Sequence, residues 1–171
     1  MSLTLNNLTE FHNAVVSGIK EKIPELGTVA AYNPIYQQSL NTPAVLIELT
    51  EMEPADTISG GRTAVTLSMA AHVFLAASDN LEDLQLAIRN LAVYVLQAVH
   101  RNHWGLTGAV GSPKLVEAVP GGFKPDCDGY ESWIVTWEQV IYLGKEHQPL
   151  TWQPKAINLN FNYHIDRYEH Y

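Results

Sequence analysis

Several features are scarce in this sequence of 171 residues, and each scarcity narrows the class of protein. A single cysteine, Cys127, leaves no possibility of a disulfide within these residues and suits a reducing compartment such as the cytoplasm. No apolar run approaches the roughly 20 residues that a membrane-spanning helix needs. The first residues, MSLTLNNLTEF, have neither the basic stretch nor the apolar core of a secretion signal, so we expect none.

Basic residues are also scarce. Lys and Arg number 10 against 18 Asp and Glu, which gives a formal net charge of −8. The basic residues form no run along the chain. Because binding to nucleic acid or to anionic membranes relies on clustered Lys and Arg, we expect neither specific nucleic-acid binding nor membrane binding.

The sequence contains no recognisable catalytic motif. His100 and His103 lie three residues apart on a predicted helix, but zinc requires three or four ligands, and histidines at a helix end interact favourably with its dipole. Cys127 lies between Asp126 and Asp128, whose charges disfavour a reactive thiolate. We therefore assign no catalytic, cofactor-binding or metal-binding residue and expect no enzyme.

Two adjacent segments with clear periodicity are the main positive signal. Apolar residues recur at every second position in residues 62–77, which predicts a long strand. They recur at steps of three and four in residues 79–104, which predicts an amphipathic helix with N-cap candidates at 78–80 and an end near His103. A straight strand over 62–77 would run roughly 50 Å. Either it bends, or one end projects beyond the domain.

The remaining elements complete an α+β pattern. A helix is predicted over residues 7–22, where Asn7 and Glu10 resemble a capping box. Strands are predicted over residues 28–32, 44–52, 114–119 and 130–143, with Trp133 and Trp137 on the core face of the last one. The predicted order is α-β-β-β-α-β-β, with two helices packed on a mainly antiparallel sheet of about five strands. Residues 1–145 would form this single domain.

Residues 146–171 form a separate extension with a strand-like pattern. Pro149 and Pro154 mark a connector, and alternating apolar residues follow it. The apolar positions are Ile157, Leu159, Phe161, Tyr163 and Ile165. Such a segment could join its own sheet or add to the sheet of a neighbouring subunit, so we expect the extension to serve in subunit contacts.

An acidic cluster accompanies the first hairpin. It consists of Glu48, Glu51, Glu53 and Asp56. A solvated surface is the default interpretation of such a cluster, and a functional acidic surface is the alternative.

The succession of elements resembles the tail terminator proteins of phages, in particular those of Mu-like contractile-tailed phages and prophages. The resemblance covers most of residues 5–145 and is carried by the early strand TVAAYNP with the helix before it, and by PAVLIELTEMEP, TAVTLSMAAHVFLAAS, EDLQLAIRNLAVYVLQAVHRNHWG and YESWIVTWEQVIYLG. The likeness lies in the order and lengths of these stretches, and none is a diagnostic motif.

This resemblance implies a non-enzymatic structural protein without cofactors. Members of the family cap the tail tube as a homo-oligomeric ring, usually a hexamer, and their partners are the tail tube protein and the head–tail connector. The protein would assemble in the host cytoplasm and end in the virion tail. The hairpin loop would contact a neighbouring subunit or the tube through Asp56, Ile58, Gly60, Gly61 and Arg62.

Two further expectations follow from the resemblance. The alternating C-terminal segment would be an inter-subunit strand, and the acidic cluster would face a lumen through which DNA passes. Two alternatives remain open at this point. The chain could be another head–tail completion or adaptor protein, or it could be a small-ligand-binding α+β domain that uses its aromatic strands as a pocket floor.

Overall fold

The computed structural model describes residues 4–33, 40–56, 61–79, 82–121 and 129–145. The elements follow the order α1 (Leu8–Lys22), β1 (Thr28–Ala31), β2 (Ala44–Pro54), β3 (Thr63–Ala76), α2 (Leu84–Val99), β4 (Lys114–Pro120) and β5 (Tyr130–Leu143), with a 3₁₀ turn at Ala77–Asp79. The predicted α+β class and order of helices and strands are confirmed.

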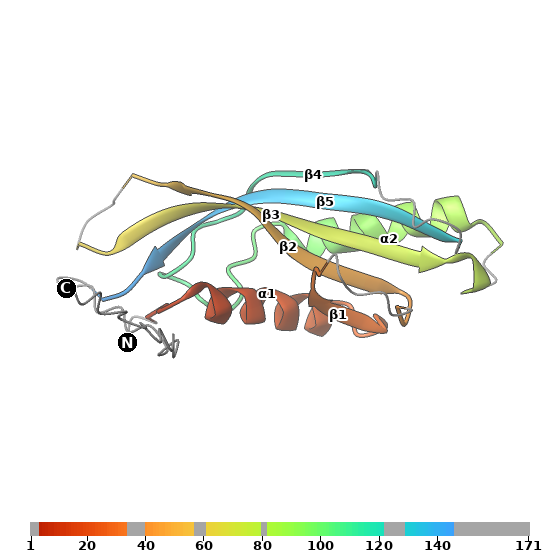
Figure 1. Cartoon of the computed structure of the whole chain (residues 1–171), viewed down its shortest axis with the longest axis horizontal. Helices are drawn as coiled ribbons and strands as arrows, with labels where there is room; N and C mark the ends of the chain where they lie inside the picture. Colours follow the sequence, from red (N-terminus) through yellow and green to blue (C-terminus); the bar gives the residue numbers. More distant parts are fainter. Residues whose placement is uncertain (1–3, 34–39, 57–60, 80–81, 122–128, 146–171) are drawn as a thin grey trace, which may run out of the picture.

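The strands form one five-stranded sheet in the order β1-β2-β3-β5-β4 (Figure 1). β1 runs parallel to β2, whereas the other three pairs are antiparallel, which confirms a mainly antiparallel sheet. β3 and β5 pair along their whole length, from Thr63 opposite Leu143 to Ala76 opposite Tyr130. This pair is the centre of the sheet.

The hydrophobic core lies between one face of the sheet and the two helices. Alternate residues of β3 and β5 face it, because side chains of a strand point to opposite faces in turn. Trp137 of β5 is 1% exposed, and Trp133 packs against the core while half-buried. The prediction that both tryptophans belong to the core face is therefore confirmed. Core residues from the helices are Phe11, Val15, Ile19, Ile88, Ala92, Val95, Ala98 and Val99.

The start of α1 agrees with the sequence prediction. The Asn7 side chain caps the helix by accepting a hydrogen bond from the Glu10 backbone N–H at 3.0 Å. The Glu10 carboxylate reaches back to the backbone N–H of Asn6 at 3.0 Å, one residue earlier than in a regular capping box. Two of the otherwise unpaired N–H groups at this end are thus satisfied.

The predicted start of α2 near Asp79 is wrong, because α2 begins at Leu84 and is capped by Asp83, which accepts from the Leu86 N–H at 2.9 Å. Asp79 has a different task. Its carboxylate accepts from the backbone N–H of Ala76 at 3.0 Å and from the Thr42 hydroxyl at 2.9 Å. It therefore ties the end of β3 to the segment before β2.

The predicted end of α2 near His103 is also wrong, since the helix ends at Val99. Arg101 adopts a left-handed conformation with φ of 56°, a conformation that commonly ends a helix and that glycine favours. The helix therefore stops before the next glycine, Gly105, which lies four residues after Arg101. The Asn102 side chain then donates to the Ala98 carbonyl at 2.9 Å and so satisfies one of the last free carbonyls.

Gln139 of β5 holds the segment after α2 onto the sheet. This side chain is 1% exposed. Its Oε1 accepts from the indole N–H groups of Trp104 at 2.8 Å and Trp137 at 3.2 Å. Its Nε2 donates to the carbonyls of Asn102 at 2.9 Å and Gly111 at 2.7 Å. Both lone pairs and both N–H groups of the amide are used, so this buried polar group is fully satisfied.

The edge strand β4 is irregular. Its register with β5 shifts between Lys114 and Glu117, and Leu115 between them has φ of 50° and is 72% exposed. A bulge, a charged residue and the terminal Pro120 are features that protect a sheet edge from pairing with other chains. β4 is therefore a poor acceptor for an added strand.

We predict that Gln139→Leu destabilises the fold strongly. It would leave two indole N–H groups and two carbonyls without their partner. Each buried unsatisfied group costs about 1–3 kcal/mol, so the free energy of unfolding should fall by roughly 4 kcal/mol or more. Urea denaturation followed by circular dichroism measures the change. Glu138→Gln, on the opposite face of β5, should change it by less than about 0.5 kcal/mol. Equal stability of wild type and Gln139→Leu would contradict the role assigned to the amide.

Candidate functional site

The face of the sheet that points away from the helices is the first candidate surface. Both helices pack against the core rows of β3 and β5, so the alternate rows of these strands face away from them. The register defines how these outward rows cross the sheet. One row contains Glu48, Ala70, Thr136 and Glu117, and the next contains Leu46, His72, Ile134 and Val119.

A β-bulge at Thr50 gathers the acidic residues of β2 onto this face. The register between β2 and β3 shifts between Leu49 and Glu51, and the Thr50 hydroxyl donates to the Ser68 carbonyl at 3.0 Å. Without the extra residue, Glu51 and Glu53 would point to the helix side, because a shift of one residue exchanges the two faces of a strand. The β3 partners of Glu48, Glu51 and Glu53 are Ala70, Ser68 and Thr66, which share the outward face.

The same face carries acidic residues from the other half of the sheet. Glu117 of β4 and Glu138 of β5 belong to outward rows, with Lys114 opposite Glu138. The Thr136 hydroxyl lies 3.4 Å from the Glu117 carboxylate. Glutamates from three strands therefore outnumber the basic residues of these rows, Lys114 and His72. The resulting surface has a negative potential that would repel phosphates and attract cationic groups.

A cluster of Tyr32, Glu48 and His72 lies on this face and was not predicted. His72 Nε2 lies 2.7 Å from Glu48 Oε2, and the Tyr32 ring stacks on the imidazole with centroids 4.5 Å apart. The His72 side chain is 13% exposed. The outward position of His72 was visible in its alternation, but its diagonal pairing with Glu48 depends on the register between strands. No nucleophile completes a catalytic arrangement with this pair within the part of the chain that the structure describes.

Among the described residues, no group of three or more His, Cys, Asp or Glu side chains is placed to hold a metal ion. The imidazole of His103 lies 3.1 Å from the Ser112 hydroxyl. Cys127 lies outside the described residues.

The hairpin between β2 and β3 is the second candidate surface. Asp56 and Gly61 are exposed on either side of its tip, and Gly61 has φ of 79°. Arg62 is engaged within its own chain, because it donates to the Gly108 carbonyl at 3.0 Å and its guanidinium lies 5.2 Å from the centroid of the Tyr142 ring. Ile58 and Gly60 lie outside the described residues.

The chain leaves the sheet at the same end as this hairpin. Leu143, the last residue of β5, pairs with Thr63 at the start of β3, and the Gly144 N–H donates to the Leu5 carbonyl at 2.9 Å. The start of β3 and the end of β5 therefore lie side by side at this end of the sheet (Figure 1). The predicted contact residues Ile157, Leu159, Phe161, Tyr163 and Ile165 lie outside the described residues.

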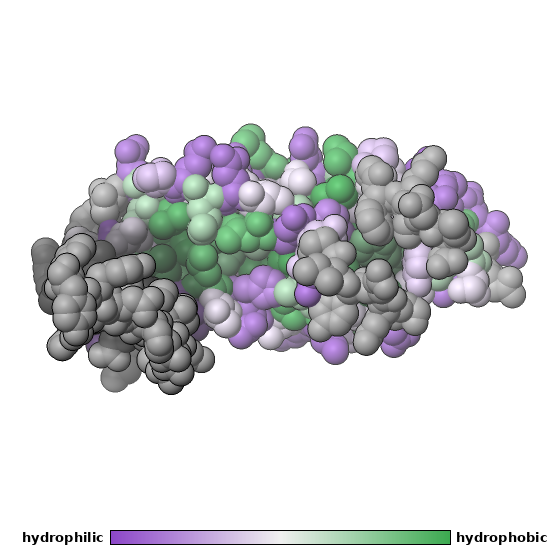
Figure 2. All heavy atoms as spheres, viewed as in Figure 1, coloured by the Kyte–Doolittle hydropathy of each residue, from purple (hydrophilic) through white to green (hydrophobic). Residues whose placement is uncertain are grey.

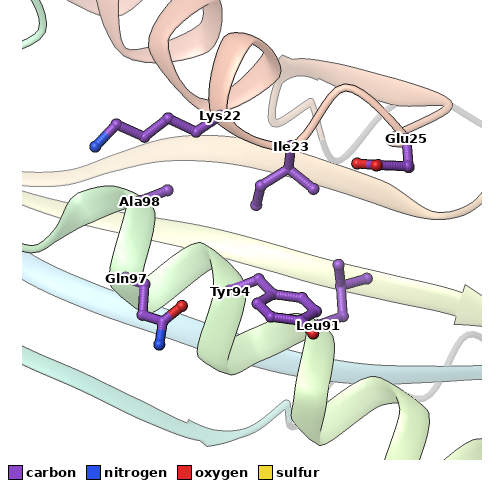
Figure 3. Close-up of a pocket in the computed structure, with 7 residues that line it drawn as sticks. All are labelled: Lys22, Ile23, Glu25, Leu91, Tyr94, Gln97 and Ala98. Carbon is purple, nitrogen blue, oxygen red and sulfur yellow. The ribbon is translucent and has the colours of Figure 1, made fainter.

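A groove of about 690 Å³ between the end of α1 and α2 is the feature nearest to a ligand site (Figure 3). Ile23 lies across it from Leu91 and Tyr94, while the Lys22 amine and the Glu25 carboxylate lie at opposite ends. Small-molecule sites bring a few polar groups together around an apolar cavity. The polar groups of this groove do not converge in that way.

Comparison of the sequence with known proteins finds no matching family model and no matching curated protein. Among the residues that the structure describes, no helix has the length and apolar character needed to cross a membrane.

We predict that the double variant Glu51→Gln/Glu53→Gln is more heat-stable than the wild type at low salt. The neutral amides remove repulsion between like charges on one exposed face, and we expect a rise in the melting temperature on the order of 1 °C. The rise should vanish at 1 M NaCl, where charges are screened within about 3 Å. Glu51→Asp/Glu53→Asp keeps both charges and serves as the control. An equal rise at both salt concentrations would contradict the electrostatic explanation.

Proposed function

We propose that the protein is a structural subunit of a phage or prophage tail that caps the tail tube as a homo-oligomeric ring and joins the tail to the head, as tail terminators do. The projecting hairpin carries this proposal. The paired ends of β2 and β3 extend past both helices at one end of the molecule (Figure 1). An arm that packs against no helix of its own subunit is suited to reach a neighbouring subunit or the tube.

In such a ring each subunit would contact the next through two different surfaces. Contacts of this kind close into a ring when the rotation between subunits closes. The exposed tip near Asp56 and Gly61 would supply one contact, together with Ile58 and Gly60. Arg62 would stiffen the base of the arm, because its contacts with Gly108 and Tyr142 lie within its own subunit.

The acidic sheet face would line the lumen in this proposal. Glu48, Glu51 and Glu53 lie on one face because of the bulge, and the chain as a whole carries a formal charge of −8. DNA is held at protein surfaces mainly through contacts between its phosphates and Lys or Arg. An acidic lumen would therefore let DNA pass without binding to the wall.

Another head–tail completion or adaptor protein would use the same arm and the same acidic face. The two proposals differ in the partner, because only a terminator is expected to bind the end of the tube. A small-ligand-binding domain is the weaker alternative, since Trp137 fills the core and the polar groups of the groove between the helices do not converge.

We predict closed rings with a central hole, which we expect to contain six subunits. Light scattering after size-exclusion chromatography at two protein concentrations gives the mass, and negative-stain microscopy shows the shape. Where the free protein is monomeric, tail tubes built from the matching tube protein should be capped at one end on mixing. A protein that forms no ring and caps no tube would overturn the proposal.

The contribution of the arm can be tested with matched loop variants. Replacing residues 57–60 by an equally long Gly-Ser segment should keep the fold, because the pairing of β2 with β3 ends at Pro54 opposite Val65. We expect this variant to lose ring formation or tube capping. The same replacement in residues 122–125, in the loop before β5, is the control and should keep both. Equal loss in the two variants would argue against a specific role of the arm.

A further inference from the structure

The outer edge of β2 is open beyond the end of β1. β1 pairs with residues 44–47 of β2, and the last contact on this side is the Tyr32 N–H, which donates to the Ile47 carbonyl at 2.8 Å. Residues 49–54 of β2 have no strand neighbour on this side among the described residues. An open edge presents unpaired N–H and C=O groups that can accept another strand.

An apolar cleft of about 240 Å³ lies directly below this open edge. It separates α1 from β2 and β3, and Figure 2 shows hydrophobic surface exposed between the hairpin and α1. Met52 continues the apolar surface along β2, because it pairs with Leu67 of the core row and is 55% exposed. The cleft is lined mainly by Leu8, Phe11, Ala31, Leu49, Leu67 and Met69.

The cleft also contains a polar atom that has no partner among the described residues. His12 lines the cleft, and its buried Nε2 makes no hydrogen bond to any residue that the structure describes. Buried polar atoms in folded proteins are nearly always paired. The apolar lining of the cleft, the open edge and this nitrogen together indicate that the site is completed by another segment of polypeptide.

We propose that residues 157–165 of a neighbouring subunit add to the open edge of β2 as a further strand and fill the cleft. The inference rests on the proposed ring assembly. In this segment apolar residues occupy every second position, so a strand would direct all of them to one face. That face would cover the cleft, as in other cases where a peptide extends a sheet and side chains fill pockets below it.

The opposite face of the added strand suits the acidic surface beside it. Its residues would be Asn158, Asn160, Asn162 and His164. Glu51 and Glu53 lie on the outward face of β2 next to this position. Asn side chains donate hydrogen bonds to carboxylates without adding negative charge, so the polar row complements the acidic row.

The length of the chain allows the connection. Residues 145–156 lie between the end of β5 and the alternating segment, and 12 residues span at most about 40 Å. The connector starts at the end of the sheet where the hairpin projects, which is the end that would face the next subunit in the ring. The nine residues 157–165 would run about 30 Å, enough to pair with all of residues 49–54.

The test compares full-length variants that differ in one row of the segment. Leu159→Asn/Phe161→Asn makes the apolar row polar, whereas Asn160→Ser/Asn162→Ser changes the polar row and is the control. We expect hydrogen exchange at the amides of residues 49–54 to be slow in the wild type and about tenfold faster or more in the first variant. The mass from light scattering should fall in the first variant and stay unchanged in the control.

A second variant changes the acceptor side. Met52→Lys places a charge at the rim of the cleft and should reproduce both effects, whereas Met52→Leu should reproduce neither. Rings without protection of residues 49–54 would overturn this inference and leave the proposed function intact. A monomer whose protection is lost in Leu159→Asn/Phe161→Asn would mean that the strand adds to its own subunit, and would overturn the assignment to a neighbour. Absence of rings, of tube capping and of protection would overturn both proposals.

Discussion

The uninterrupted pairing of β3 with β5 sets the dimensions of the whole molecule. Each strand has 14 residues and therefore runs about 46 Å. The two helices have 15 and 16 residues and reach only about 23 Å, because a helix rises 1.5 Å per residue. Neither helix alone covers the full length of the central strands, and the hairpin arm follows from this difference in length. The open edge of β2 follows from the shortness of β1, which pairs only with residues 44–47.

Two local features then determine how the interior is held together and which side chains lie on each face of the sheet. The buried amide of Gln139 ties the segment that follows α2 to β5, and it does so with all of its hydrogen-bonding groups. The bulge at Thr50 rotates the outer part of β2, so that its glutamates share one face and Met52 lies on the other. The hydrogen bonds of Gln139 keep the interior in a single arrangement, and the bulge separates an acidic surface from an apolar one.

Periodicity alone predicted the fold class, the order of the elements and the full extent of β5, because each strand or helix buries one face. Periodicity did not predict those features for which several residues in the sequence are equally suitable. Asp79 and Asp83 are both plausible N-caps, and the choice depends on Thr42, which lies 37 residues before Asp79. Periodicity did not predict the common face of Glu48 and Glu51, since simple alternation places them on opposite faces. The pairing of His72 with Glu48 likewise depends on a register that is set between strands.

The irregularity of β4 limits the uncontrolled addition of further chains to the sheet. A sheet with two receptive edges can recruit further chains on both sides and extend without limit, as in fibrils. Here the bulge at Leu115, with Lys114 and Pro120, blunts one edge, while the other edge is formed by the short strand β1 and by residues 49–54 of β2. In the proposed assembly each chain would offer one acceptor edge and one donor segment, and would therefore join two neighbours. Such an assembly would end by closing into a ring.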